Sequence, residues 1–237
     1  MFDISIVIPA YNEERAIATA IRRAADYFSR SGKSFEIIVV DDGSADHTSE
    51  RVREEMRSHP MLRLLRNDTN QGKGFSVKRG ALSASGEWIL FLDADLSTQP
   101  EEFEKLKPAM QDHDIVIGSR VLRDSVIAVH QPFLREWAGR FFNKVVQWYL
   151  GLPLSDTQCG FKCFNRRTKI LFEKQTLAGW AFDVELLFLA QKMGFRIAEA
   201  PVVWTNDPTS TVRPRDVLAV LRDLRQIKKC WSDYRIS

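Results

Sequence analysis

Short apolar runs alternate with amphipathic stretches along the first half of the chain. The runs are rich in β-branched residues, and each ends at a polar or glycine-containing turn. They predict strands over residues 4–8, 35–40, 62–65, 88–92 and 114–118. The stretches between them predict helices, with Asn12 as the cap of the first and Ser44 or Asp46 at the start of the second. Later helices are expected from about residue 75 to 83 and from about 100 to 110. This alternation predicts an α/β fold, a doubly wound and mostly parallel sheet with helices on both faces.

The second half of the chain has a less regular pattern. A helix is expected from Phe182 to Met193, then a strand over 196–204, and finally a helix with an apolar stripe and a basic opposite face. The segment from Pro132 to Leu150 interleaves aromatic and aliphatic residues with Arg140 and Lys144. This composition is typical of an amphipathic helix at a membrane surface, but a buried helix or a dimer face shows the same periodicity.

Length and composition fit one large α/β domain or one domain with an appendage. The chain has 237 residues, of which 44% are hydrophobic, enough to bury a sizeable core. No apolar run reaches the ~18 residues of a membrane span, and the first residues show no basic segment or cleavage site of a signal peptide. Three cysteines are too few for a disulfide framework, and Cys159 and Cys163 lack partners for zinc. A reducing cytoplasm is the expected location.

The net charge of +3 is unevenly placed along the chain. Basic residues outnumber acidic ones between residues 119 and 150, and again from residue 201 onward. These local excesses predict an anionic partner near the second half of the chain. No recognisable nucleic-acid-reading motif accompanies them, so a nucleic acid is not the expected partner.

Two carboxylates follow the apolar run 88–92. Asp93 and Asp95 are separated by one residue, and on an extended segment their side chains would point the same way. An ordinary acidic loop is the simpler interpretation of such a pair. Two anions at one spot favour a cation, and oxygen ligands of this kind suit Mg²⁺ or Mn²⁺.

Polar residues or glycine follow the other predicted strands as well. In open α/β sheets ligands bind outside the carboxyl ends of the strands, so these residues are expected to converge along one edge. They are Tyr11, Glu13, Asp41, Asp42, Gly72, Lys73, Asp93 and Asp95. The simpler roles of helix caps and turns fit Asn12, Ser44 and Asp46. The glycine patterns of dinucleotide-binding folds and of P-loop NTPases are both absent.

Several motifs occur together in order along the chain. Segments 6–14, 40–48, 72–74 and 93–95 read IVIPAYNEE, VDDGSADHT, GKG and DAD. This set resembles the family 2 glycosyltransferases, which have the GT-A nucleotide-sugar fold. Segments 118–120, 156–162 and 180–186, which read GSR, DTQCGFK and WAFDVEL, are similar to the branch that makes dolichyl-phosphate or polyprenyl-phosphate glucose and mannose. The resemblance runs from about Ile4 to Val212.

The resemblance implies a division of the chain. A GT-A domain would occupy residues 1–212, with a nucleotide-binding half at about 1–118 and an acceptor half at about 119–212. Residues 213–237 would form a separate basic amphipathic helix.

On the donor side, the resemblance implies a nucleoside pocket lined by Pro9, Tyr11, Glu13 and Asp42. Asp41 would either contribute to this pocket or hold its own loop. Gly72 and Lys73 would approach the base or the diphosphate, since glycine permits close backbone contact and lysine is a mobile point charge.

For the metal, the resemblance implies that Asp93 faces the ribose and the metal and that Asp95 binds the metal directly. Relatives that make dolichyl-phosphate mannose add a glutamine ligand two residues later. This chain has Ser97 there, a shorter and weaker ligand.

On the acceptor side, the resemblance implies that Arg120 and Arg135 grip the lipid phosphate through bidentate guanidinium pairs. Some relatives add a serine four residues after the second arginine, where this chain has Gly139. The family also uses a loop near both phosphates, to which this chain contributes Asp156, Gln158 and Lys162. Asp156 is expected to be important there.

The reaction implied is an inverting transfer of glucose or mannose from a UDP- or GDP-sugar to a polyprenyl or dolichyl phosphate. A lipid phosphate is already ionised near pH 7 and needs no general base. A hydroxyl acceptor on a glycan or glycolipid would need one, for which Asp183 and Glu185 are candidates. Asp183 is equally suited to the first turn of its helix.

A catalytically silent nucleotide-sugar binding module is the remaining alternative, which the intact Asp93 and Asp95 pair disfavours. A lipid acceptor implies a peripheral position on the cytoplasmic face of a membrane. A membrane-protein partner or a homodimer could contribute to that attachment.

Overall fold

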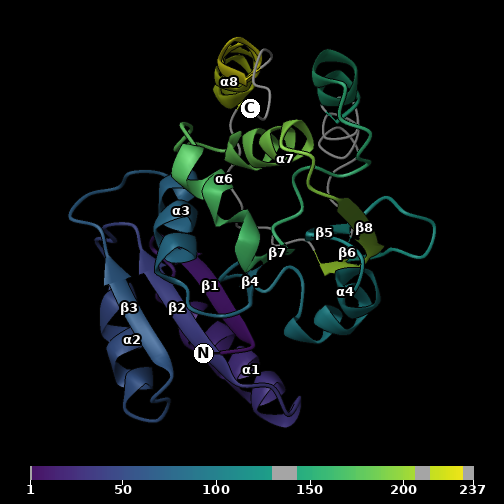
Figure 1. Cartoon of the computed structure of the whole chain (residues 1–237). Coiled ribbons are helices and arrows are strands. Elements are labelled where there is room, and N and C mark those ends of the chain that lie inside the picture. Colours follow the sequence, from purple (N-terminus) through teal and green to yellow (C-terminus); the bar gives the residue numbers. More distant parts are fainter. Residues whose placement is uncertain (1, 130–142, 206–213, 232–237) are drawn as a thin grey trace.

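A mostly parallel sheet forms the centre of the protein (Figure 1). The computed structural model describes residues 2–129, 143–205 and 214–231, with only the backbone described at residues 129 and 214–221. Within these residues the sheet has seven strands, in the order β3-β2-β1-β4-β7-β5-β8. The strands are β1 (Ile4–Ala10), β2 (Phe35–Asp41), β3 (Leu62–Arg66), β4 (Trp88–Phe91), β5 (Ile115–Ser119), β7 (Lys162–Asn165) and β8 (Ile197–Pro201).

Helices cover both faces of this sheet, which confirms the doubly wound α/β fold (Figure 1). The helices are α1 (Ile17–Arg30), α2 (Thr48–Met56), α3 (Lys73–Ser83), α4 (Phe103–Met110), α6 (Lys169–Lys174), α7 (Phe182–Lys192) and α8 (Pro214–Trp231). Short 3-10 helices lie at Pro100–Glu102 and Arg166–Thr168, and residues 143–150 are also helical.

Two hydrophobic cores form because alternate strand residues face opposite sides of the sheet. On β1, Ile6 and Ile8 pack toward α1, α2 and α4, whereas Val7 packs toward α3, α6 and α7. Strands buried on both faces read as continuous apolar runs, as β1, β2, β4 and β5 do. With β3, which is partly exposed, the first five strands were predicted to within two residues.

The starts of the first two helices differ from the prediction. α1 begins at Ile17, and the Asn12 side chain accepts a hydrogen bond from the Ala45 N–H instead of capping the helix. Asn12 has a φ of 56°, a left-handed conformation that asparagine tolerates. α2 begins at Thr48, and Asp46 accepts the Thr48 N–H at 3.0 Å. Asp46 also accepts the Glu14 N–H at 3.1 Å, so Asn12 and Asp46 together link the loops after β1 and β2.

β7 was not predicted, and it is the one antiparallel strand among the described strands of the main sheet. It lies between β4 and β5, and its Cys163 is paired with Leu90 of β4 on one side and with Val116 of β5 on the other. The strand predicted over 196–204 is divided in two. Its second part, β9 (Val203–Thr205), leaves the main sheet and pairs in parallel with β6 (Val126–Val129).

The segment from Pro132 to Leu150 is described only from residue 143 onward. There, Val146 and Leu150 are buried in the core and Trp148 is 85% exposed, so this helix combines a packed side with a projecting aromatic ring. As predicted for the last helix, α8 buries Leu224 and Ile227 and exposes a basic side.

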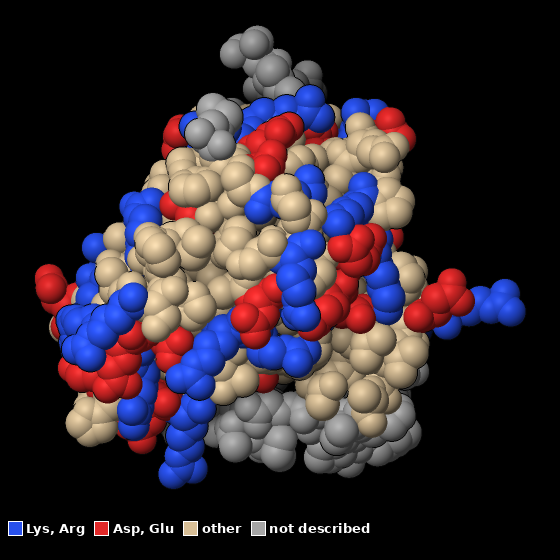
Figure 2. Space-filling model, turned by 90° about the horizontal axis from the view of Figure 1, so that it is seen from below, with Lys and Arg blue, Asp and Glu red and all other residues tan. Residues whose placement is uncertain are grey.

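No described helix is both long enough and apolar enough to cross a bilayer. Figure 2 shows the face at the bottom of Figure 1, where basic and acidic side chains are intermingled. The positive net charge is therefore not gathered on that face.

A buried carboxylate joins the starts of the first strands. Glu36 on β2 is 1% exposed, and its register partner Ser5 on β1 donates a hydrogen bond to it at 2.7 Å. Ser85 donates to it twice, at 2.7 and 2.6 Å, and Arg63 donates at 2.9 Å. Burial alone would raise the pKa of Glu36, but these donors outweigh it and the pKa is lowered.

Because its pKa is lower in the folded protein, ionised Glu36 contributes stability above its unfolded pKa and loses it as the pH falls. We expect the free energy of unfolding to decrease below about pH 4.5, the ordinary pKa of a glutamate. Glu36→Gln should lower the free energy of unfolding at pH 7 by about 1–3 kcal/mol and flatten its dependence on acid pH. Urea unfolding at pH 7 and pH 4 measures both. An equally steep acid dependence in the variant would contradict this role.

Candidate active site

The predicted site residues gather at one edge of the sheet because of the directions of the strands. β1, β2 and β4 are parallel and end at this edge, whereas the antiparallel β7 begins there. The first residue of β7, Lys162, is paired with Phe91, the last residue of β4. The loop before β7 is therefore brought beside Asp93.

Asp93 forms an ion pair with Lys73, the first residue of α3. Lys73 Nζ lies 2.7 Å from Asp93 Oδ1, and each side chain is 27% exposed. Burial alone would raise the pKa of Asp93, but the Lys73 ammonium outweighs it and the pKa is lowered. Burial likewise disfavours charged Lys73, yet its pKa is raised by Asp93 and, to a smaller extent, by Asp183 and Asp95. Both partners therefore stay charged near neutral pH.

Asp95 lies close enough to Asp93 to feel its charge, but the extended geometry expected for the pair was wrong. β4 ends at Phe91, and both aspartates lie in the turn that follows, where Leu96 has a φ of 53°. The Ser97 N–H donates to Asp95 Oδ1 at 2.8 Å. Burial, and then the Asp93 carboxylate, raise the pKa of Asp95. The turn, and not the strand, brings the two charges together.

Gly160 packs directly against the Asp93 carboxylate. A Cβ atom placed on Gly160 would lie 1.9 Å from Asp93 Oδ2 and 2.6 Å from its Cγ. Only glycine fits this position without displacing the carboxylate. Asp93 is thus confined between the Lys73 ammonium and the backbone of the loop before β7.

A second buried ion pair lies behind the first. Lys162 is 1% exposed, and its Nζ lies 3.0 Å from Asp183 Oδ1 and donates to the Cys159 carbonyl. Asp183 is in the first turn of α7. Burial raises the pKa of Asp183 even though Lys162 and Lys73 act to lower it. Asp183 therefore serves in this structure as the counter-ion of Lys162.

Arg120, just after β5, is held by Asp156. Arg120 Nε and Nη2 donate to the two carboxylate oxygens at 2.7 and 2.9 Å, and the Arg120 backbone N–H donates at 3.0 Å. Asp156 is fully buried; burial alone would raise its pKa, but Arg120 outweighs this and the pKa is lowered. Asp156 is four residues before Gly160, which touches the Asp93 carboxylate, so the Arg120–Asp156 pair borders the same cluster.

Two residues that support this arginine were not identified from the sequence. Glu199 on β8 accepts hydrogen bonds from the backbone N–H groups of Ser155, at 2.8 Å, and Asp156, at 3.0 Å. Trp204 on β9 lies under the guanidinium, with 5.4 Å between Arg120 Cζ and the ring centroid. A glutamate within the otherwise apolar run 197–203 was the only sequence signal for either residue.

Asp41 and Asp42 organise the neighbouring loops. Asp41 is fully buried and accepts hydrogen bonds from the Ser44 N–H, at 2.9 Å, and from the Ser49 hydroxyl. Asp42 accepts the N–H groups of Gln71 at 2.9 Å and Gly72 at 2.8 Å, and it also accepts from Asn67. Asp42 therefore reaches the Lys73 region through the backbone of Gly72.

The other predicted donor residues lie on or just after β1. Pro9 is half-buried within the strand, and Tyr11 is 48% exposed. Glu13 is half-buried, and its backbone N–H donates to Thr48 on α2 at 2.8 Å. On the acceptor side, the Gln158 N–H donates to Asp156 at 3.2 Å, whereas Arg135 lies outside the described residues.

Glu185, the second candidate base, is fully buried, and its carboxylate is occupied by hydrogen bonds within the protein. Its carboxylate accepts hydrogen bonds from the N–H groups of Thr176 and Leu177, from the Thr176 hydroxyl, and from Trp231 Nε1 of α8 at 3.0 Å. The adjacent Ala178 carbonyl accepts the Gly74 N–H at 2.8 Å. Glu185 thus links α8 to the segment that positions the start of α3.

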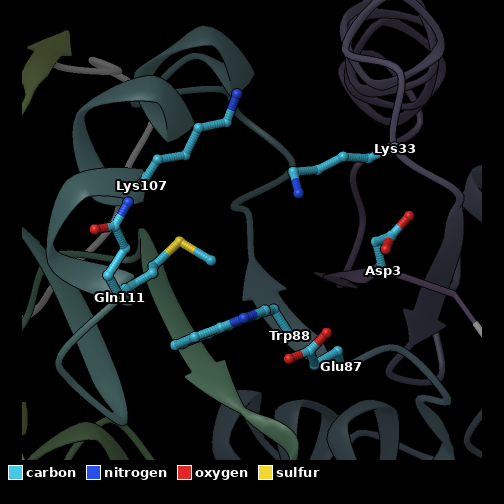
Figure 3. Close-up of a pocket in the computed structure, with 7 residues that line it drawn as sticks. Asp3, Lys33, Glu87, Trp88, Lys107 and Gln111 are labelled. Carbon is cyan, nitrogen blue, oxygen red and sulfur yellow. The ribbon is translucent and has the colours of Figure 1, made fainter.

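A surface hollow lies at the opposite edge of the sheet (Figure 3). It is lined by Asp3, Lys33, Glu87, Trp88, Lys107, Met110 and Gln111. Asp3 and Glu87 directly precede β1 and β4, so the hollow is at the amino ends of the strands. It is separate from the carboxylate cluster.

Comparison with known proteins agrees with this arrangement. The profile described as Glycosyl transferase family 2 matches residues 5–169. The chain belongs to glycosyl transferase family 2. This glycosyltransferase is similar to the dolichyl-phosphate beta-glucosyltransferase of Dictyostelium discoideum, with 38% identity over 225 residues, 89% of this chain and 69% of the relative. The enzyme of that name from Homo sapiens is 34% identical over 227 residues, 89% of this chain and 70% of the relative.

Solved structures show the same fold. Glucosyl-3-phosphoglycerate synthase from Mycobacterium tuberculosis, in complex with Mn²⁺, UDP and phosphoglyceric acid, superimposes with a TM-score of 0.72. The match covers 100% of this chain and 80% of that one, at 20% sequence identity. The GT-A fold expected for this glycosyltransferase is therefore confirmed.

The contact between Gly160 and Asp93 gives a direct test of the cluster. Gly160→Ala places a methyl group where the Asp93 carboxylate lies, so the carboxylate must move. We expect the rate of sugar transfer from a nucleotide-sugar donor to fall by about 100-fold or more, while the circular dichroism spectrum is preserved.

Gly179→Ala is the matched control, because a Cβ atom at Gly179 would meet nothing within 4 Å. This variant should keep at least half of the wild-type rate. A fully active Gly160→Ala variant would show that the position of Asp93 is not critical.

Proposed function

We propose that this glycosyltransferase moves glucose from UDP-glucose to the phosphate of a dolichyl or other polyprenyl phosphate, with inversion and with a bound Mg²⁺ or Mn²⁺. The observation that supports it most is the closeness of two differently charged sites. The carboxylates Asp93 and Asp95 suit a cation with its diphosphate, and Arg120, held by Asp156 in the loop whose Gly160 touches Asp93, suits a second phosphate. Relatives over most of the chain are named dolichyl-phosphate beta-glucosyltransferases.

The residues present fit a divalent cation that is shared with the donor. Asp93 and Asp95 lie on one turn, closed by the Leu96 N–H donating to the Asp93 carbonyl at 3.1 Å, and the Asp93 charge raises the pKa of Asp95. In the part of the chain that the structure describes, no group of three or more His, Cys, Asp and Glu side chains could hold a metal alone. Oxygens of the donor diphosphate would complete the shell, as is usual for Mg²⁺. When bound, the metal would stabilise the negative charge of the departing diphosphate.

On the donor side, the chain's own residues would bind and orient the nucleotide. Tyr11 offers an exposed ring face to the base, with Pro9 and Glu13 beside it. Asp42 keeps Gly72 in place, and its carboxylate or the backbone that it orders would meet the base. Lys73, whose ammonium stays protonated, would assist the charge that develops on the diphosphate.

On the acceptor side, Arg120 would hold the lipid phosphate. Asp156 fixes the guanidinium plane through Nε and Nη2. A guanidinium has five N–H donors, more than one carboxylate accepts, so donors remain for a phosphate oxygen. Asp156 is then a positioning residue, with its backbone held by Glu199, and Trp204 lies against the guanidinium. Gln158 and Arg135 would complete the phosphate site.

A phosphate acceptor makes a general base unnecessary, since it is already ionised near pH 7. Asp183 is bound to Lys162, and Glu185 is buried and surrounded by donors. This arrangement favours a phosphate over a hydroxyl as the attacking group. In this proposal Lys162 adds positive charge near Asp93, and Asp183 is its counter-ion.

The lipid acceptor implies a position at a membrane surface, and we propose the cytoplasmic face. Trp148, 85% exposed, and the basic side of α8 are suited to an interface with anionic head groups. We keep the division into a donor half at 1–118, an acceptor half at 119–212 and a basic helix from 213 as part of this proposal. A membrane-protein partner or a second copy could share this surface.

Removal of one carboxylate tests the metal-dependent reaction. The protein is incubated with Mn²⁺, UDP-glucose and dolichyl phosphate, and the glycolipid is detected by mass spectrometry. Asp95→Asn should reduce the product by about 100-fold or more, because an amide is a poor ligand for a hard cation. EDTA should abolish product formation by the wild type.

Asp112→Asn, an exposed aspartate after α4, is the matched control and should be as active as the wild type. An active Asp95→Asn variant, or full activity in EDTA, would exclude the metal assignment. UDP- and GDP-linked glucose and mannose assayed side by side would identify the donor.

A conservative change of Arg120 tests the acceptor site. Arg120→Lys keeps a positive charge but loses the planar pair with phosphate, so the KM for dolichyl phosphate should rise about tenfold or more. The KM for UDP-glucose should change by less than about threefold. Arg123→Lys, an exposed arginine three residues later, should change neither value. A larger change in the KM for UDP-glucose than in the KM for dolichyl phosphate would assign Arg120 to the donor site instead.

A further inference from the structure

The ammonium group of Lys73 occupies a place beside the two carboxylates where a cation is needed. It lies 2.7 Å from Asp93 Oδ1 and also acts electrostatically on Asp95 and Asp183. Lys162 Nζ lies 3.0 Å from Asp183 Oδ1, so two of the three carboxylates, Asp93 and Asp183, already have an ammonium partner. The protein therefore already neutralises most of the charge that a metal would neutralise.

The backbone at Lys73 is fixed, whereas its side chain can reach more than one partner. Gly72 has a φ of 102°, and a Cβ there would lie 2.4 Å from the Ala178 carbonyl oxygen. The Gly74 N–H donates to the same oxygen at 2.8 Å. The lysine side chain passes Trp180, with Nζ 5.4 Å from the ring centroid. Rotation about its four-carbon stem can move the ammonium without moving the loop.

We propose that Lys73 is the internal counter-ion of Asp93 in the metal-free enzyme, that it competes with the divalent metal for this carboxylate, and that it transfers to the diphosphate when the donor binds. This inference rests on the proposed function. The metal alone has to displace a short, partly buried ion pair, and it leaves the ammonium without its carboxylate partner and next to a second positive charge. When the diphosphate enters as well, the ammonium gains a new anionic partner.

The exchange makes metal and donor binding cooperative. A nucleoside diphosphate tightens metal binding, and by thermodynamic reciprocity the metal tightens nucleotide binding by the same factor. Part of this coupling comes from direct contact between metal and diphosphate, and Lys73 adds a separate part. Removal of Lys73 should therefore strengthen the binding of the metal in the absence of a nucleotide. Loss of a merely structural residue would weaken it.

The test measures Mn²⁺ binding by electron paramagnetic resonance of free Mn²⁺, with and without UDP. Lys73→Met should bind Mn²⁺ alone about tenfold more tightly than the wild type, since a neighbouring positive charge is removed. The factor by which UDP tightens Mn²⁺ binding should fall by about tenfold. Lys73→Arg, which keeps the charge, should stay within about threefold of the wild type in both measurements.

Lys33→Met is the matched control, because it removes an exposed lysine at the opposite edge of the sheet. It should leave Mn²⁺ binding unchanged. It therefore distinguishes competition by Lys73 from the effect of lowering the net charge of the whole protein. Circular dichroism and thermal unfolding verify that each variant folds.

A measurement on the wild type does not depend on any variant. The Lys73 amine is held by Asp93, so Mn²⁺ alone should free it and raise its rate of acetylation by acetic anhydride at least about threefold. Further addition of UDP should lower the rate again. Peptide mass spectrometry measures both rates at Lys73, with Lys33 as the internal reference.

The outcomes distinguish this inference from the function on which it rests. Equal or weaker Mn²⁺ binding by Lys73→Met, or no change in Lys73 acetylation on addition of Mn²⁺, would overturn the competition while the metal site remains. Absence of Mn²⁺ binding by the wild type, with UDP and without it, would overturn the metal site itself.

Discussion

The antiparallel pairing of β7 with β4 determines the geometry of the site. Because β7 begins where β4 ends, Lys162 and the loop before it are delivered to Asp93 from a part of the chain about 70 residues away. Gly160 then contacts the Asp93 carboxylate, and Asp156 of the same loop holds Arg120. A parallel strand in this position would have carried Lys162 to the opposite edge of the sheet. The meeting of the carboxylate pair with the arginine therefore depends on this single reversal of direction.

Most of the sheet could be predicted from the sequence because β1, β2, β4 and β5 are almost wholly buried, and the partly exposed β3 still contains three leucines. β1 to β5 appear as apolar runs that end in charge or glycine, and this local signal needs no tertiary information. β7 has four residues, one of which is the buried Lys162, so it lacks such a run. The division of the predicted strand 196–204 into β8 and β9 was also missed, because Val203 and Trp204 look like a continuation of the same strand. Their departure is determined by pairing with β6.

The sequence indicates which residues come to the carboxyl edge of the sheet, and it does not indicate how they pair. Asp93, Asp95 and Lys73 were found because they follow strands, and Arg120 and Asp156 because they resemble family motifs. Which residue binds which depends on contacts between distant segments, such as Lys73 with Asp93 and Lys162 with Asp183. Even the correct grouping of Asp93 and Asp95 was predicted from the wrong geometry, since a turn and not a strand brings them together. Glu199 holds the backbone of Asp156, Trp204 lies against Arg120, and neither residue carries a motif of its own.

The hydrogen bond from Trp231 to Glu185 has a consequence for how small this enzyme can be made. The residues that match the family profile end at 169, yet the carboxylate that orders Thr176 and Leu177 takes one of its donors from the last described turn of α8. A version trimmed to the profile would lose α7 and this carboxylate together, and one ending before α8 would keep a buried anion with one donor fewer. The minimal catalytic unit is therefore longer than the segment by which the family is recognised.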